Sequence, residues 1–226
     1  MRYLAFIIAA LTSAEMQAFG LAPRLVVNVT IDQLRTDYME AFYPLYGQGG
    51  FRRLMQQGLV YEGGRYPFTP VDRSSATATL SSGATPYLHG IVGTQWLDRS
   101  TLRPVNCVGD EKYSSSPQRL LTSTLGDELK MSSNGTAIVY SFSQDKESAI
   151  LSAGHAADGA FWMGTNGTWT GTKYYSTSLP AWLKAYNTLH PQQGRAAALA
   201  NDNVVSVSLQ AVTSAAMGRD EMPDLL

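Results

Sequence analysis

The chain has 226 residues, of which 44% are hydrophobic and 15% charged, and its formal net charge is -1. This composition is that of a globular protein and excludes a disordered or collagen-like chain. The balanced charge argues against a nucleic-acid-binding protein, for which a basic excess is expected. The length suits one large domain or part of one.

The first 20 residues differ from the rest. Arg2 precedes a short apolar run, Leu4 to Leu11, and small and polar residues follow. This order is typical of a secretory signal, and the run is too short to span a bilayer comfortably. We therefore expect a signal peptide over 1–20, a periplasmic or secreted protein, and no transmembrane segment after cleavage. A buried N-terminal helix is the alternative.

The single cysteine, Cys107, excludes an internal disulfide and a metal site built from cysteines. We expect a small buried residue there rather than a nucleophile.

The clearest strand is Leu25 to Ile31, whose apolar, β-branched sequence predicts burial on both faces of a parallel sheet. Asp32 follows it. An acidic residue at the carboxyl end of such a strand is placed for ligand contact, although it could instead cap the helix expected over 34–42.

Strands and helices alternate along the remaining chain, which predicts an α/β fold: a doubly wound, mostly parallel sheet flanked by helices. Asn166-Gly167 predicts a small β-hairpin, interpreted as an insertion. An apolar strand start at the C-terminus suggests the N-terminal part of something longer. Helices are expected at 51–57, 74–82, 116–130, 145–151, 178–186 and 203–217, and strands at 59–66, 135–140, 159–163, 169–175 and 223–226.

A small-residue helix follows the extended Thr-Pro-Val segment and begins at Asp72, Arg73 or Ser74. Its unpaired N–H groups and partial positive charge suit a bound anion. The alternative is a plain N-cap at Asp72 or Ser74.

The three histidines, His89, His155 and His190, fall in no metal-ligand spacing. We expect structural hydrogen bonds for the first two and a surface position for the third. The sequence contains no P-loop or Rossmann glycine motif and no G-x-S-x-G elbow.

The order of several short motifs resembles the alkaline phosphatase superfamily, and most closely the single-Thr bacterial alkaline phosphatases related to nucleotide pyrophosphatase/phosphodiesterases. The resemblance covers nearly all of the chain after the signal. The motifs are the strand ending in Asp32, then 49–54, 82–91, Trp96, 148–155, 159–162, 173–175, 179–182 and 223–226.

The resemblance implies an alkaline-phosphatase-like domain over 21–226 and a hydrolase acting on a phosphorylated small molecule. It also implies two zinc ions, with Asp32 as a metal ligand and the other ligands beyond Leu226. In the family a Thr or Ser at the helix start, activated by zinc, attacks phosphorus. Substrate and oligomeric state stay open.

The matched positions depart from the family pattern. Arg73 stands where the nucleophile is expected, and Ser74 is one residue later. Thr94 replaces the family's Asn, and the Lys-x-Arg pair falls on Asp145 and Glu147, which would repel phosphate.

Three hypotheses follow from these residues. The first is a phosphate-ester hydrolase with an altered site, in which Ser74 and Thr94 are catalytic and Arg73 binds substrate; this chain alone is expected to be inactive. The second is a non-catalytic protein of the same fold, in which Arg73 grips an anion. The third is a sulfatase or mutase-like metalloenzyme, argued from fold analogy alone.

Overall fold

The computed structural model describes residues 23–191 and 199–226. The expected signal peptide over 1–20 lies outside the described residues. Within them, no helix is both long enough and apolar enough to cross a bilayer.

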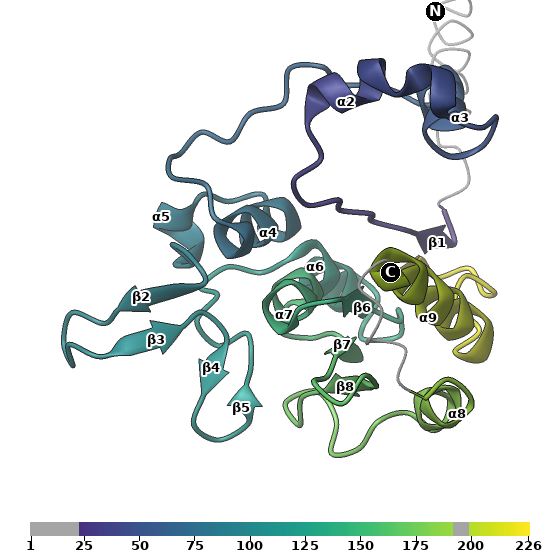
Figure 1. Ribbon diagram of the computed structural model, residues 1–226. Helices are drawn as coiled ribbons and strands as arrows, with labels where there is room; N and C mark the ends of the chain where they lie inside the picture. The colour runs from purple at the N-terminus through teal and green to yellow at the C-terminus, as the bar shows by residue number, and fades with distance from the viewer. Residues whose placement is uncertain (1–22, 192–198) are drawn as a thin grey trace, which may run out of the picture.

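A mostly parallel sheet forms the centre of the molecule (Figure 1). β9 pairs in parallel with β1, and its Leu225 also bridges in parallel to Val139, just before β6. β7 pairs in parallel with β6 and antiparallel with β8, so the order is β1-β9-β6-β7-β8. The strands are β1 (Leu25–Val26), β6 (Tyr140–Ser143), β7 (Gly159–Met163), β8 (Trp169–Gly171) and β9 (Asp224–Leu225).

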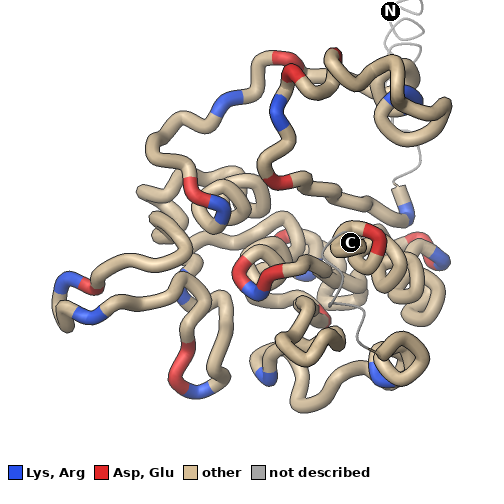
Figure 2. The backbone as a smooth tube through the Cα atoms, viewed as in Figure 1, with Lys and Arg blue, Asp and Glu red and all other residues tan. Residues whose placement is uncertain are grey.

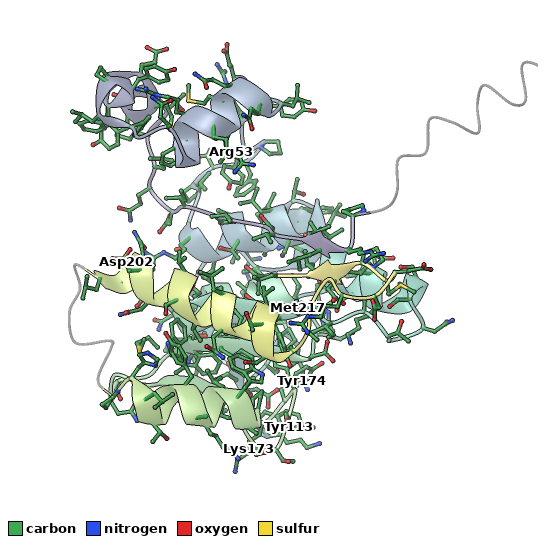
Figure 3. The ribbon with its side chains drawn as sticks, turned by 90° about the vertical axis from the view of Figure 1, so that its right-hand side faces the viewer. Arg53, Tyr113, Lys173, Tyr174, Asp202 and Met217 are labelled. Atoms are coloured by element: carbon green, nitrogen blue, oxygen red, sulfur yellow. The ribbon has the colours of Figure 1, made fainter. Side chains whose placement is uncertain are left out.

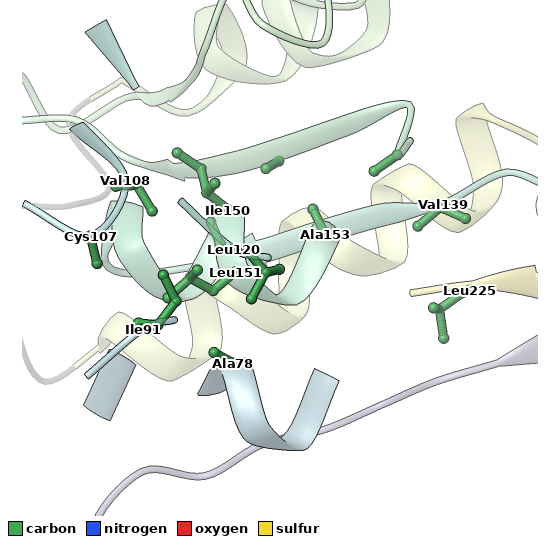
Figure 4. Close-up of a cluster of buried hydrophobic side chains, with 13 residues drawn as sticks. Ala78, Ile91, Cys107, Val108, Leu120, Val139, Ile150, Leu151, Ala153 and Leu225 are labelled. Atoms are coloured by element: carbon green, nitrogen blue, oxygen red, sulfur yellow. The ribbon is translucent and has the colours of Figure 1, made fainter. Parts of the chain in front are cut away.

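Helices cover both faces of this sheet. Because successive side chains of a strand point to opposite faces, Ala160 of β7 joins the core that contains Ile150 and Leu151 of α7, whereas Phe161 joins a second core with residues of α8 and α9. Figure 4 shows Ile150 and Leu151 within the first core. The expected α/β class with a flanked, mostly parallel sheet is thus confirmed. The helices are α4 (Arg73–Ser82), α6 (Leu125–Ser132), α7 (Lys146–Ala153), α8 (Ala181–Leu189) and α9 (Ala200–Ser214).

Helix α4 packs directly against α7. Its buried positions carry only small side chains, which include Ser74, Thr77 and Ala78 and let the two helices approach closely. Ser81 fixes the contact, because its Oγ donates to the carbonyl oxygen of Leu151 on α7 at 2.8 Å. This packing brings the N-terminal ends of both helices to one side of the molecule.

Smaller elements surround this body. Two antiparallel ribbons project from it, whereas the first helices form a separate layer that buries no residue within α2 or α3 (Figures 1 and 3). The expected hairpin at Asn166-Gly167 forms, and its strands β7 and β8 belong to the central sheet. The elements are α2 (Thr36–Ala41), η1 (Tyr43–Leu45), α3 (Gly50–Gln57), α5 (Pro86–His89), β2 (Gln95–Leu97), β3 (Pro104–Asn106), β4 (Gly109–Asp110) and β5 (Ser114–Ser115).

Four strand predictions were wrong in place or extent. The strand expected over 135–140 lies at Tyr140–Ser143, and the strand expected over 169–175 ends at Gly171. The strand expected over 25–31 ends at Val26, and Val29 beyond it is 74% exposed. The segment 59–66 is irregular, and Tyr61 is 83% exposed. β-branched and aromatic residues stabilise a strand through neighbours across the sheet, and the described residues place no strand beside 27–31 or 59–66.

The start of α6 was also misplaced. Ser116-Pro117 was expected to open the helix, but it begins at Leu125. Thr124 is the N-cap, and its side chain accepts from the Asp127 backbone N–H while Asp127 accepts in return, which forms a capping box. This reciprocal cap satisfies two backbone donors and so outweighs the Ser-Pro signal.

Asp127 also ties α6 to the turn after α7. It accepts hydrogen bonds from the backbone N–H groups of His155 and Ala156, each at 2.7 Å, and lies 3.0 Å from His155 Nδ1. Burial alone would raise the pKa of Asp127, but these hydrogen bonds and those from Thr124 lower it to about 2. The hydrogen bond to Asp127 in turn raises the pKa of His155.

The structural role expected for His155 is therefore confirmed. His89 likewise makes structural hydrogen bonds, to Thr79 Oγ1 at 3.0 Å and from the backbone N–H of Ile91 at 3.1 Å.

Gly154 is required at this junction. Its φ is +79°, and a Cβ there would collide with Thr124 Oγ1 and lie 2.7 Å from Asp127 Oδ2. We predict that Gly154→Ala lowers the free energy of unfolding by about 1–3 kcal/mol more than Gly135→Ala. Gly135 is the matched control, since its φ is +81° but a Cβ added there would meet no atom within 4 Å. Urea unfolding followed by circular dichroism measures both, and equal losses would contradict the role of the collision.

Candidate active site

A pocket of about 450 Å³ lies at the starts of α4 and α7. Figure 2 shows acidic and basic positions meeting where α4 begins. All four sequence-predicted site residues line it. The lining residues are Asp32, Gln33, Val71, Asp72, Arg73, Ser74, Thr94, Asp145 and Glu147.

Both helix starts carry an internal carboxylate. Asp72 caps α4 by accepting from the Ser74 backbone N–H at 2.8 Å, and it forms a capping box with Ser75. Asp145 caps α7 by accepting from the Ser148 backbone N–H at 2.8 Å. The N-cap expected at Asp72 or Ser74 therefore forms at Asp72. At the N-terminal end of each helix, the carboxylate of Asp72 or Asp145 therefore accepts a hydrogen bond from a backbone N–H group and offsets part of the partial positive charge.

Arg73 extends from the first turn of α4 toward Asp32. Its Nε donates to Asp32 Oδ2 at 2.6 Å, and its Nη1 lies 3.8 Å from Asp145 Oδ2. The hydrogen bond to Asp32, against a smaller opposing effect of burial, raises the pKa of Arg73. Asp32 is thus in the site, as the sequence predicted, but one of its oxygens already has a cationic partner.

Two hydroxyl groups line the same pocket. Ser74 Oγ and Thr94 Oγ1 are 2.9 Å apart, and the Thr94 hydroxyl is 3.1 and 3.2 Å from the two carboxylate oxygens of Asp72. Ser74 is fully buried, whereas Thr94 is half-buried. The arrangement is a hydrogen-bonded chain of carboxylate and hydroxyls, with Thr94 the more accessible hydroxyl.

The charge of the pocket is predominantly negative. Four of its lining residues are acidic and Arg73 is the basic one. Glu147 points one oxygen toward Asn106, whose Nδ2 donates to it at 2.9 Å. A phosphate dianion in this pocket would face Asp32, Asp145 and Glu147 with one guanidinium to offset them, so its binding is electrostatically disfavoured.

The described residues do not by themselves complete the two-zinc site that the resemblance implies. Across 23–191 and 199–226, no three His, Cys, Asp or Glu side chains converge closely enough to hold a metal ion. Zinc bound by protein needs about four ligands at short distances. Asp32 supplies one carboxylate, and Arg73 occupies one of its oxygens.

Sequence reasoning missed three neighbours of the site. Gln33 lines the pocket next to Asp32, Asn106 orients Glu147, and Cys107 lies fully buried against Ser74. The position of Gln33 directly after Asp32 was a usable signal. The other two reach the site from the ribbon β2-β3 and its end, and no local pattern places that ribbon.

Comparison with known proteins identifies the scaffold. The model of the type I phosphodiesterase / nucleotide pyrophosphatase family matches residues 26–226. The chain belongs to this family. The family falls within the alkaline phosphatase superfamily, as the motif order indicated, so the chain is related to phosphate-ester hydrolases.

Curated relatives agree with this assignment. The chain is 36% identical to alkaline phosphatase PhoV of Synechococcus elongatus over 176 residues, which cover 73% of this chain and 32% of the relative. It is 32% identical to alkaline phosphatase PafA of Elizabethkingia meningoseptica over 177 residues, which cover 73% of this chain and 32% of that protein. A Myroides odoratus protein named calcium-transporting ATPase is 29% identical over 223 residues, 88% of this chain and 41% of that protein.

Solved structures show the same fold. The crystal structure of wild-type alkaline phosphatase PafA superposes with a TM-score of 0.83 at 24% identity, covering 90% of this chain and 52% of that one. The alkaline-phosphatase-like fold predicted from the sequence is confirmed. The family member described here spans about a third to two fifths of the length of these curated relatives.

The single cysteine of this family member gives a test of the packing below the site. Burial raises the pKa of Cys107 to about 11, with the hydrogen bond to Ser74 opposing it. At pH 8 only about one thiol in a thousand would be ionised, and the group is enclosed as well. We predict no reaction of the folded protein with Ellman's reagent at pH 8, and full reaction in guanidinium chloride. Rapid stoichiometric reaction without denaturant would contradict the burial.

Proposed function

We propose that the protein is a member of a phosphate-ester hydrolase family whose altered site does not carry out the family's hydroxyl attack on phosphorus. The single observation behind this proposal is the ion pair between Arg73 and Asp32 at 2.6 Å. At the position where the family places its nucleophile, the chain presents a guanidinium, which has no lone pair to attack phosphorus. That guanidinium also engages the carboxylate expected to bind metal.

The surrounding charges support the same proposal. Asp145 and Glu147 stand where the family's cationic pair stabilises the transferred group, and both are acidic. The caps of α4 and α7 already satisfy backbone donors that could otherwise hold a phosphoryl oxygen. An anion-binding role for Arg73 is disfavoured by the same contacts, since an anion must compete with Asp32 for the guanidinium.

We predict that the purified protein with added zinc does not hydrolyse p-nitrophenyl phosphate or bis(p-nitrophenyl) phosphate above the buffer rate. Release of p-nitrophenolate, followed at 405 nm, is the measurement. The Elizabethkingia alkaline phosphatase, assayed in parallel, is the positive control. Turnover that rises with protein concentration and disappears in Asp32→Asn would sink the proposal.

A second candidate is retained hydrolysis of a phosphorylated small molecule, by an exported, periplasmic or secreted, zinc-dependent protein. The chain Asp72–Thr94–Ser74 favours it, because a carboxylate that accepts a proton activates a hydroxyl. In this scheme Asp72 takes the proton of Thr94, the Thr94 oxygen bonds to phosphorus, and the ester oxygen leaves and is protonated by solvent. Water then releases phosphate from Thr94.

The two hydroxyls can be separated if turnover is found. Thr94→Val should then lower kcat at least about a hundredfold, the scale expected for loss of nucleophile and base together. Ser74→Ala should lower kcat less, since Ser74 is fully buried and its hydroxyl contacts that of Thr94. Unchanged turnover in Thr94→Val would eliminate this mechanism, and circular dichroism checks that both variants are folded.

A further inference from the structure

His155 lies directly after α7, and its ring contacts two oxygen atoms. Its Nδ1 is 3.0 Å from Asp127 Oδ2, and its Nε2 is 3.0 Å from the carbonyl oxygen of Leu120. A carbonyl oxygen can only accept a hydrogen bond, and the same is true of an ionised carboxylate. Each ring nitrogen therefore has to donate, whereas a neutral imidazole carries a single N–H group. With Asp127 ionised, the two contacts together require the imidazolium form.

The hydrogen bonds around Asp127 show that its carboxylate is ionised. Oδ1 accepts from the backbone N–H groups of His155 and Ala156, each at 2.7 Å, and Oδ2 accepts from the backbone N–H of Thr124 at 2.8 Å. A carboxyl proton would have to displace one of these donors. Burial alone would raise the pKa of Asp127, but the hydrogen bonds lower it to about 2. His155 and Asp127 thus form an ion pair, and the His155 side chain is still 35% exposed, so solvent reaches the ring.

The contact with Leu120 holds a buried segment that has no helix or strand. Residues 116–124 link β5 to α6 through bends and turns. The buried residues of this segment are Ser116, Pro117, Leu120 and Thr124. Backbone groups in such a segment need partners from elsewhere, because no helix or sheet supplies them. His155 supplies one to the Leu120 carbonyl, and the backbone N–H of Leu121 donates to the His89 carbonyl oxygen at 3.0 Å.

The other elements around the imidazole ring favour its charged form or do not titrate near neutral pH. α7 presents its C-terminal end, whose partial negative charge stabilises a cation, while its charged residues Lys146 and Glu147 lie in its first turn. Tyr174 and Tyr175, after β8, are titratable neighbours of Asp127. Burial, and to a smaller extent the charge of Asp127, raises the pKa of both tyrosines, so they stay neutral.

The ion pair makes the stability of this junction depend on pH. The hydrogen bond to Asp127 raises the pKa of His155 above the ordinary 6.5, against an opposing effect of burial. A group whose pKa is raised by folding stabilises the fold fully below pH 6.5, and this contribution is lost as the pH rises through the folded-state pKa. The lowered pKa of Asp127 keeps its side of the pair intact at any pH above about 4. The contacts are therefore complete from about pH 4 to 6.5 and weaken at higher pH.

We propose that His155 is a pH-dependent clamp, whose imidazolium form holds residues 116–124 against the junction of α6 and α7 and whose neutral form releases the carbonyl oxygen of Leu120. The carboxylate of Asp127 is the stronger acceptor, so the ring keeps its proton on Nδ1 and the proton on Nε2 passes to solvent. The freed carbonyl group then has to reach water, and the segment opens locally. The clamp belongs to the fold and does not depend on whether the pocket hydrolyses phosphate esters.

NMR of the histidine rings in the ¹⁵N-labelled natural chain tests the charge state directly. Correlation of the ring nitrogens with the carbon-bound ring protons separates the imidazolium from either neutral tautomer, and spectra are recorded from pH 6 to pH 8.5. The signal that disappears in His155→Gln assigns His155, and His190→Gln is the control at an exposed ring. At pH 6 we expect both ring nitrogens of His155 to be protonated, with a titration midpoint above 6.5.

Hydrogen–deuterium exchange at the backbone N–H groups of Leu120 and Leu121 tests the release of the segment. Protection factors, which correct for the direct effect of pH on exchange, are compared at pH 6 and pH 8.5. In the natural chain and in His190→Gln they should fall about twofold to tenfold, the equilibrium factor of one hydrogen bond. In His155→Gln they should not change with pH, because glutamine donates one hydrogen bond but does not titrate. His89 is present in all three proteins, so its own titration cancels in the comparison.

Three results would each overturn the inference. The first is a His155 ring that is neutral at pH 6. The second is protection of Leu120 and Leu121 that does not change with pH in the natural chain, and the third is an equal change in the natural chain and in His155→Gln. If His155→Gln fails to fold, the natural chain still decides, because through-bond NMR assigns His155 and either of the first two results refutes the clamp. Hydrolysis of p-nitrophenyl phosphate is scored separately, so it would refute the proposed function and leave this inference standing.

Discussion

The close contact of α4 with α7 is the constraint on which the site depends. Small side chains on the buried face of α4, together with the Ser81 hydrogen bond to Leu151, bring the helices together and set both N-terminal ends at one pocket. Two helix starts side by side concentrate backbone N–H groups and partial positive charge. Such a place suits an anion, and this chain fills it largely with its own carboxylates.

The charges of the pocket form one linked set. Asp72 and Asp145 cap the helices, and Asp32 and Asp145 both face Arg73. Arg73 thus compensates part of the negative charge of the pocket, and the helix N-termini and Asn106 hold the remaining carboxylates. The family fold is kept while Arg73, Asp145 and Glu147 stand at positions where the resemblance implies other residues, so the fold by itself does not fix the reaction.

Local signals decided what the sequence could predict. α4 and α7 were placed to within one or two residues, since Asp72 and Asp145 cap them and Gly83 and Gly154 follow them. The hairpin at Asn166-Gly167 was also predicted from a local signal, the Asn-Gly dipeptide of its turn. The strand predictions over 25–31 and 59–66 were wrong because an apolar composition indicates a preference for burial. It does not show whether a neighbouring strand is present to bury the segment.

The same division applies to the site. Asp32, Arg73, Ser74 and Thr94 were brought together by motif order, and the pocket contains all of them. The direction of the Arg73 side chain could not be predicted from the sequence, because it depends on where the segment that carries Asp32 runs relative to α4. The contact of Cys107 with Ser74 could not be predicted either, since 33 positions along the chain separate the two residues and no short-range sequence pattern spans that interval.

The extended segment after β1 has a consequence for handling the protein. Val27, Val29 and Ile31 are all about half exposed or more, and the backbone N–H of Asn28 donates to the carbonyl oxygen of Leu226, directly after β9. An extended, β-branched segment with open backbone groups is a template for pairing with another chain. A charged residue at position 29 is expected to discourage such pairing.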